Sequence, residues 1–207
     1  IILVRGAAKL LRLTPWLIEN SLIHFLCVAA VSLTGSGILL PINKRIHSHK
    51  RHDNRAWAEI NLSLLGQNIN ALRSKLTGGC DIMAVVKADA YGHGALRISK
   101  KLNQSGVQAF AVATAEEGIQ LRRHGVKGEI LILGYTPPAQ FPQLRRFRLS
   151  QTITDYTYAV ILNRFSQRLR VHLAVDTGMH RIGVPFSEIR EISEIYGMER
   201  LEVAGIY

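Results

Sequence analysis

From Ile82 to Tyr207 the sequence alternates short apolar runs with longer amphipathic segments, one pair about every 20 to 30 residues. Short apolar runs are typical of buried strands, and the segments between them follow helical spacing. Strands that alternate with helices pair in parallel through right-handed crossovers. The six predicted strands are Ile82–Val86, Ala109–Ala113, Glu129–Leu133, Gln151–Thr154, Val171–Val175 and Glu202–Ile206.

Both a doubly wound open sheet and a TIM barrel satisfy this alternation. The barrel is favoured because the conspicuous polar residues follow the carboxyl ends of strands, where barrel active sites lie. The spacing also never lengthens enough to indicate a reversal of winding direction. Six strands do not close an eight-stranded barrel. The predicted fold class is therefore α/β, a partial TIM (β/α)8 barrel with about six βα units.

Ahead of these strands, Ala56–Ile60 alternates like a half-buried strand, and Ser63 is a suitable N-cap for a helix that Gly78 and Gly79 would stop. The helices predicted between the strands are 95–104, 115–124, 138–146, 155–165 and 186–196.

The first predicted strand leads into a lysine. Residues Ile82–Gly94 read IMAVVKADAYGHG, and the apolar half lacks polar alternation, as in a strand buried on both faces. Lys87 would then lie at the mouth of the barrel, where an amine can form a Schiff base with an aldehyde. A lysine at a strand end is more often a solvated charge. The glycines after Lys87 let backbone approach a bound group, so a ligand-binding loop is predicted there.

The run AVVKADAYGHG closely resembles the pyridoxal-phosphate lysine motif of the alanine racemase family. That resemblance implies that Lys87 carries the cofactor, pyridoxal 5'-phosphate, as a Schiff base and acts as one of two catalytic bases. It also implies that Tyr91 donates a hydrogen bond to the cofactor phosphate.

A second apolar strand runs into a glycine-containing loop at His172–Gly183, HLAVDTGMHRIG. Arg181 offers a planar donor for a carboxylate or a phenolate, and Asp176 is expected to brace the loop. An arginine in a loop is otherwise usually a surface charge.

The loop resembles the DTGM-x-R-hydrophobic-G signature of alanine racemases. By that match Arg181 contacts the phenolic oxygen of the cofactor and the substrate carboxylate, and Met179 lines the same pocket. His180 fills a variable position and receives no role. Many members have a lysine that orients the arginine where this sequence has Ala174, so another group must position Arg181.

Residues Ser21–Ile42 contain no Asp, Glu, Lys or Arg, and 22 helical residues reach roughly 33 Å, enough to cross a bilayer core. A transmembrane helix is predicted here, with a buried helix of a soluble protein as the alternative. Residues 1–20 fit an interfacial helix or the end of a preceding loop. Residues 43–55 form a basic linker, which indicates a cytoplasmic side and favours contact with membrane lipid, unless it is simply solvated.

The predicted domains are thus a membrane segment, 1–42, a basic cytoplasmic linker, 43–55, and a truncated barrel domain, 56–207.

The net charge of +11 is concentrated at the start: residues 1–55 hold eight Lys or Arg against two acidic residues, and the remainder hold eighteen against thirteen. No nucleic-acid motif accompanies the charge, so no nucleic-acid partner is predicted.

Cys27 and Cys80 lie far apart, without the spacing of a zinc site or a disulfide framework. A reducing compartment and no metal site are predicted, including at His47, His49 and His52, which lack carboxylate or cysteine partners.

A racemase barrel joined through a basic linker to a membrane segment resembles the membrane-bound serine/alanine racemases of vancomycin resistance. The resemblance implies a homodimer at the cell membrane that converts a small amino-acid substrate, L-alanine or L-serine, to its D-enantiomer for peptidoglycan precursors. In the family the second base is a tyrosine from the C-terminal domain of the partner subunit, so this chain alone is expected to be inactive. A pyridoxal-phosphate barrel decarboxylase, a non-catalytic pyridoxal-phosphate carrier and a membrane sensor module remain alternatives.

Overall fold

The computed structural model describes residues 2–6, 58–76 and 78–207, with side chains described from residue 58 onward. The chain divides into two compact units, and almost all of the described residues belong to the one that contains Asn61–Tyr207 and the strand Ile2–Gly6. The fold and the site below are those of this unit.

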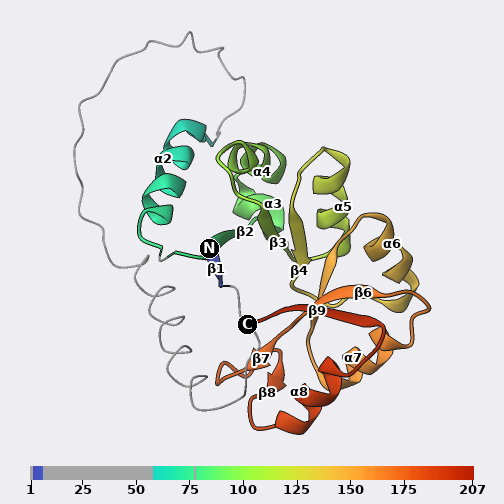
Figure 1. Cartoon of the computed structure of the whole chain (residues 1–207). Coiled ribbons are helices and arrows are strands. Elements are labelled where there is room, and N and C mark those ends of the chain that lie inside the picture. The colour runs from blue at the N-terminus through green and yellow to red at the C-terminus, as the bar shows by residue number, and fades with distance from the viewer. Residues whose placement is uncertain (1, 7–57, 77) are drawn as a thin grey trace, which may run out of the picture. The chain divides into compact units, whose positions relative to one another are not determined.

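A seven-stranded sheet forms the centre of the unit, in the order β1-β2-β3-β4-β5-β6-β9. The strands from β2 to β9 pair in parallel, and β1 pairs antiparallel with β2. Because the parallel strands follow sequence order with no reversal, the sheet is part of a barrel wall and not a doubly wound sheet (Figure 1). The strands are β1 Ile2–Gly6, β2 Cys80–Val85, β3 Ala109–Val112, β4 Glu129–Ile132, β5 Ser150–Ile153, β6 Leu169–Leu173 and β9 Leu201–Ile206. A separate parallel pair is formed by β7 Val175–Asp176 and β8 Val184–Pro185.

Helices connect the parallel strands and lie along the outside of the sheet (Figure 1). They are α2 Leu62–Arg73, α3 Lys87–Gly92, α4 Ala95–Gln104, α5 Ala115–Arg123, the 3-10 helix η2 Pro138–Gln140, α6 Phe141–Arg146, α7 Tyr156–Asn163 and α8 Ile189–Tyr196.

Two apolar clusters cover the two faces of the sheet, which explains why the strand sequences do not alternate with polar residues. On the helix side the core includes Ile82, Phe110 and Ile132, packed against α4 to α7. On the inner side a smaller cluster contains Met83, Leu131 and their neighbours. Burial on both faces confirms the interpretation of the apolar runs as strands of a parallel sheet that is covered on both sides.

The six predicted parallel strands are all present, and α4 has the predicted bounds. The strand predicted as Val171–Val175 is instead two strands, because β6 ends at Leu173 and Val175 pairs with Val184 of β8. The last helix begins at Ile189, three residues later than predicted.

The entry into α2 corrects two predictions. Ala58–Ile60 is exposed and lies outside any strand, whereas Ala56 and Trp57 are beyond the described residues. The N-cap is Asn61 and not Ser63, because the Asn61 Oδ1 atom accepts from the backbone N–H groups of Ser63 and Leu64, at 3.0 and 3.1 Å.

At the start of the chain, Ile2–Gly6 is an extended strand, so the predicted interfacial helix or loop is wrong for these residues. Hydrogen bonds with the antiparallel strand β2 satisfy the backbone N–H and C=O groups of this segment. The local sequence pattern does not reveal this pairing. The predicted membrane segment at Ser21–Ile42 and the basic linker lie outside the described residues. Within the described part, no helix has the length and apolar character to cross a bilayer.

Candidate functional site

Lys87 lies at the carboxyl end of β2, separated from its last residue, Val85, by Val86. The ladder to β3 continues through Val86, whose N–H donates to the Ala111 carbonyl at 2.8 Å. The Lys87 side chain is half-buried. Because the strands are parallel, their carboxyl ends share one edge, so the structure confirms that Lys87 lies on the edge that carries active sites in barrels.

The residues after Lys87, where a ligand-binding loop is predicted, form a turn of left-handed helix. Ala88, Asp89, Ala90 and Tyr91 all have φ between 51° and 56° and ψ between 39° and 51°. Each non-glycine residue in this conformation costs roughly 1–2 kcal/mol. Such backbone persists only where surrounding contacts fix it, and it is concentrated at functional sites.

Hydrogen bonds within the segment hold the turn. The Ala90 N–H donates to the Val86 carbonyl at 2.9 Å, and the Gly94 N–H donates to the Asp89 carbonyl at 2.9 Å. The Asp89 carboxylate accepts from the Ala95 N–H at 2.7 Å and so caps α4. Asp89 therefore connects the turn to the helix that follows it.

One carboxylate from another helix also reaches the turn. Glu117 of α5 accepts from the Ala88 N–H at 2.8 Å and from the Ala113 N–H at 2.7 Å. We did not single out Glu117 from the sequence, although Thr114 and Glu117 have the T-x-x-E spacing of a capping box, which could have drawn attention to it.

The arginine loop, residues 177–183 between β7 and β8, is braced by its own aspartate. Asp176 Oδ1 accepts from the N–H groups of Gly178 and His180, at 2.9 and 3.0 Å, and Oδ2 lies 3.0 Å from His180 Nδ1. These backbone donors, that of His180 first, hold the pKa of the Asp176 carboxyl below its ordinary value. The expected bracing role of Asp176 is confirmed, and His180, which had no predicted role, contributes to it.

Arg181 itself is exposed and lies near Tyr207. Tyr207 as a whole residue is 39% exposed, but its hydroxyl lies 3.0 Å from Oγ1 of the fully buried Thr152. Burial raises the pKa of Tyr207, and both the hydrogen bond with Thr152 and the positive charge of Arg181 oppose this rise. The position of the orienting lysine, Ala174, is buried with 2% of its surface exposed.

The predicted site residues form two groups at the carboxyl edge. Lys87 and Tyr91 share the left-handed turn, and Met179 and Arg181 share the arginine loop. Tyr91 is 44% exposed and Met179 is 73% exposed. Among the described residues, no hydrogen bond or ion pair joins the two groups.

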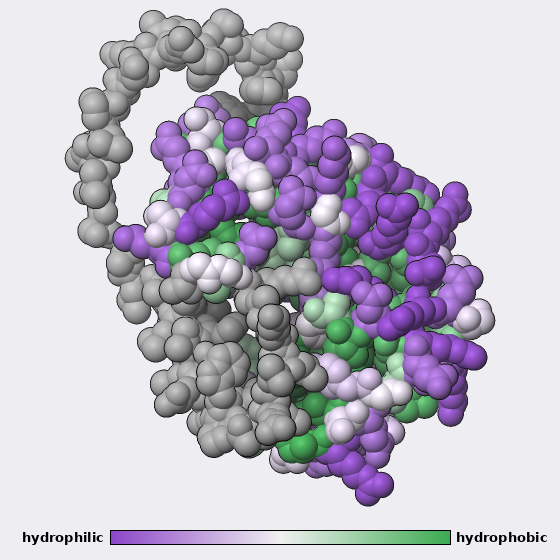
Figure 2. Space-filling model, in the orientation of Figure 1, coloured by the Kyte–Doolittle hydropathy of each residue, from purple (hydrophilic) through white to green (hydrophobic). Residues whose placement is uncertain are grey.

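Apolar side chains gather on the surface near the arginine loop, and Figure 2 shows apolar surface over this part of the molecule. The exposed large apolar residues here are Met179, Ile182, Phe186 and Ile189.

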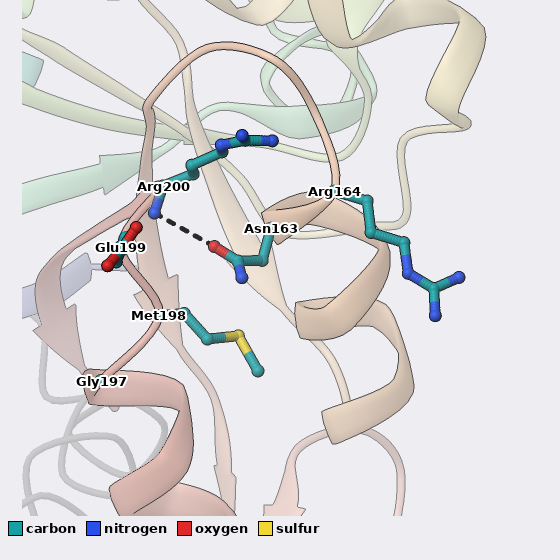
Figure 3. Close-up of a pocket in the computed structure, with 6 residues that line it drawn as sticks. All are labelled: Asn163, Arg164, Gly197, Met198, Glu199 and Arg200. Carbon is teal, nitrogen blue, oxygen red and sulfur yellow. Dashed lines mark hydrogen bonds between the residues drawn. The ribbon is translucent and has the colours of Figure 1, made fainter.

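A cavity of about 510 Å³ lies away from this edge, where α7 ends and the chain enters β9 (Figure 3). Its lining includes Asn163, Met198 and Arg200, and the Arg200 N–H donates to Asn163 Oδ1 at 3.1 Å. It adjoins the amino end of β9, opposite to the edge with Lys87, and that face of a barrel serves stability. We therefore place the candidate site at the Lys87 edge, where a cavity of about 360 Å³ is lined by residues that include Val86, Asp89 and Glu117.

The side chains at this edge fit pyridoxal phosphate by their chemistry. Lys87 offers an amine for the aldehyde, Tyr91 a phenol for the phosphate, and Arg181 a guanidinium for a phenolic oxygen or a carboxylate. No grouping of His, Cys, Asp and Glu suited to a metal ion occurs in the part of the chain that the structure describes.

Comparison with known proteins agrees with this chemistry. The family profile "Alanine racemase, N-terminal domain" matches residues 60–207. The chain belongs to the alanine racemase family. Members of this family are pyridoxal-phosphate enzymes.

Two curated racemases are similar over nearly the whole chain. An amino-acid racemase of Enterococcus faecalis is 40% identical over 204 residues, which is 97% of this chain and 29% of that protein. A serine/alanine racemase of Enterococcus gallinarum is 38% identical over 92% of this chain and 28% of its own length. The chain thus spans less than a third of the length of these two relatives.

Solved racemase structures share the fold. The crystal structure of alanine racemase from E. faecalis has a TM-score of 0.65 at 33% identity and covers 71% of this chain and 42% of its own. The Clostridium difficile alanine racemase in complex with cycloserine has a TM-score of 0.62 at 35% identity and covers 70% of this chain and 41% of its own. The predicted barrel architecture is therefore confirmed, as a half-barrel of parallel strands.

Proposed function

We propose that this racemase-family chain is the N-terminal barrel part of a pyridoxal-phosphate-dependent amino-acid racemase. The observation that supports this most directly is the position of Lys87, at the carboxyl end of β2 and at the start of a strained turn. Strain of this kind is retained where function requires it.

Bound pyridoxal phosphate would supply an electron sink that acidifies the Cα hydrogen of an amino acid. Lys87 holds the cofactor through its Nζ atom and exchanges the Cα proton on one face of the substrate. Tyr91 binds the phosphate through its hydroxyl. Arg181 binds the substrate carboxylate and the phenolic oxygen of the cofactor, and Met179 lines the substrate side.

Inversion of configuration also needs a base on the opposite face. By family resemblance this is a tyrosine of the partner subunit, so the active protein is a homodimer. The exposed residues Tyr91, Met179 and Arg181 lie on the surface that the partner would cover.

The proposed substrates are L-alanine and L-serine, and the proposed role is the supply of D-amino acids for peptidoglycan precursors of the kind associated with vancomycin resistance. The similarity to a protein named serine/alanine racemase supports the choice of these two substrates.

We also propose that the protein is membrane-anchored through Ser21–Ile42 and that the racemase domain is cytoplasmic. The proposal rests on the sequence, in which 22 residues without Asp, Glu, Lys or Arg are followed by a basic segment. Fractionation of cells that express the full-length protein tests it. Recovery in the soluble fraction without detergent contradicts the anchor.

Racemisation is tested with the purified full-length protein and L-alanine or L-serine, with the D-enantiomer measured over time. The proposal predicts D-amino acid without release of carbon dioxide, and carbon dioxide release would indicate a decarboxylase instead. Residues 56–207 alone are expected to bind the cofactor without appreciable conversion, because the second base is supplied by another part of the dimer.

A further inference from the structure

We propose that Glu117 is a positioning residue for Lys87. Its carboxylate connects the start of the left-handed turn to the neighbouring strand end and thereby fixes the direction in which the lysine side chain leaves the sheet. The inference rests on the proposed function, in which Lys87 holds the cofactor.

The contacts of Glu117 span two strand ends. Ala88, whose N–H donates to Oε1 at 2.8 Å, is the residue after Lys87, and Ala113, whose N–H donates to Oε2 at 2.7 Å, is the residue after β3. A carboxylate that accepts two backbone N–H bonds forms charge-assisted bonds, which are stronger than neutral ones. Glu117 therefore links the residue after Lys87 to the end of β3, beyond the last ladder bond, in which the Val86 N–H donates to the Ala111 carbonyl.

The geometry differs from that of an ordinary helix cap. Thr114 is the N-cap of α5, and its Oγ1 atom accepts from the Glu117 N–H at 3.4 Å. In a capping box the glutamate at the third helical position bonds to the N–H of the cap residue itself. Here the Glu117 carboxylate instead accepts from the N–H of Ala113, the residue before the cap residue Thr114. It also accepts from the N–H of Ala88, which precedes Glu117 by 29 residues. The bond to Ala88 contributes nothing to capping α5.

The turn needs such a restraint because packing does not support it on this side. A cavity of about 360 Å³ lies beside it, lined by residues that include Asp89, Val112 and Glu117. The four left-handed residues after Lys87 contain no glycine, so the right-handed conformation is the more favourable one for each of them. Without the Glu117 carboxylate, the first of these residues can relax into the cavity and carry Lys87 with it.

The test uses the full-length protein and three variants: Glu117→Gln, Glu117→Asp and Glu116→Gln. Glutamine retains only one acceptor oxygen, and the shorter aspartate does not reach both N–H groups. Glu116→Gln is the matched control, because it removes a charge from the same first turn of α5 while Glu116 contacts Gln140 and not the Lys87 turn.

Two readouts are independent of turnover. The first is the fraction of Lys87 that carries a pyridoxyl group after incubation with pyridoxal phosphate and borohydride reduction, relative to the exposed Lys100, measured by peptide mass mapping. The second is the amide hydrogen exchange of Lys87–Gly94 in the cofactor-free protein. Both are measured below the melting temperature of every variant, so that loss of global stability does not enter.

Glu117→Gln is expected to lower the pyridoxal phosphate affinity at Lys87 about tenfold or more and to speed exchange in the turn by a similar factor. For Glu117→Asp, both the cofactor affinity and the exchange rate in the turn should lie between those of Glu117→Gln and the native protein. For Glu116→Gln, both should equal the native values. In turnover, kcat should fall with KM little changed, because the lysine is misdirected while Arg181 still binds the substrate.

The inference would be overturned if Glu117→Gln and Glu117→Asp both kept the native labelling of Lys87 and the native exchange rates of the turn. It would also be overturned if Glu116→Gln lost as much Lys87 labelling as Glu117→Gln. If Glu117→Gln does not fold, the result for Glu117→Asp decides in the same way. Absence of a Lys87 adduct in the native protein would instead contradict the proposed function, so the two failures are distinguishable.

Discussion

The two loops at the carboxyl edge are held in place in different ways. The Lys87 turn is strained, and a carboxylate from a neighbouring helix fixes its first residue. The arginine loop is braced internally by Asp176, and its side chains are exposed. The barrel therefore determines the position of the lysine, whereas the arginine loop keeps its own shape and leaves Arg181 open to a ligand or a partner subunit.

The largest effect is expected from the lysine. Lys87→Ala removes the amine that holds the cofactor and one proton-transfer base, so racemisation by the full-length protein should fall by about 10³-fold or more. Lys101→Ala on α4 is the control and should retain the native rate. A rate for Lys87→Ala within tenfold of native would mean that another residue acts as the base.

The next effect tests the internal brace. Asp176→Ala removes the acceptor for the N–H groups of Gly178 and His180, and misplacement of Arg181 should lower kcat/KM about ten- to hundredfold. Adduct formation at Lys87 should be unchanged, because the lysine turn is held separately. An equal loss of labelling at Lys87 would show that the two loops are coupled and would remove the distinction between them.

The brace also has a pH dependence whose sign follows from the lowered pKa of Asp176. A carboxyl whose folded pKa lies below its unfolded value stabilises the loop above the unfolded pKa and loses this effect as the pH falls through the folded pKa. Amide exchange in residues 177–183, corrected for intrinsic rates, should therefore be constant from neutral pH to about pH 5. In a His180→Ala background, which removes the imidazole beside Asp176, it should speed up only below the ordinary aspartate range, and a transition near pH 6 there would contradict this assignment.

A smaller effect is expected at the glycines of the arginine loop. A Cβ atom at Gly183 would lie 2.7 Å from the Asp176 backbone nitrogen, whereas one at Gly178 would meet nothing within 4 Å. Both glycines have positive φ. Gly183→Ala should therefore lower the free energy of unfolding by about 1–3 kcal/mol more than Gly178→Ala does, measured by denaturant titration. An equal decrease in the free energy of unfolding for the two variants would mean that the positive φ of each glycine, and not the close contact at Gly183, determines the destabilisation.

The smallest effect tests the strain in the lysine turn. Ala88 has φ 51° and is exposed, so Ala88→Gly relieves a left-handed alanine and should raise the free energy of unfolding by up to about 1 kcal/mol. Ala71→Gly, in the interior of α2, is the control and should lower it by about 0.5–1 kcal/mol. A loss of stability in both variants would argue against strain at Ala88.

The parallel sheet could be predicted from sequence because its strands are buried on both faces and are therefore apolar throughout, as in Ile82–Val86. The positions of Lys87 and Arg181 at strand ends followed from the same pattern, and their roles came from family resemblance. Both signals are local, so a single stretch of sequence contains them.

The remaining features depend on contacts distant in sequence. Alanine is a strong helix former with right-handed preference, so nothing local indicates a left-handed turn at Ala88. The acceptor that fixes it, Glu117, is 29 residues away. The pairing of Ile2–Gly6 with β2 likewise joins segments about 80 residues apart, and no periodicity within either segment encodes it.

The most direct test of the central claim is borohydride reduction of the full-length protein with pyridoxal phosphate, followed by peptide mass mapping. The account predicts a pyridoxyl group on Lys87 in nearly every molecule at saturating cofactor, with little on the other lysines. An unmodified Lys87 under these conditions would contradict it.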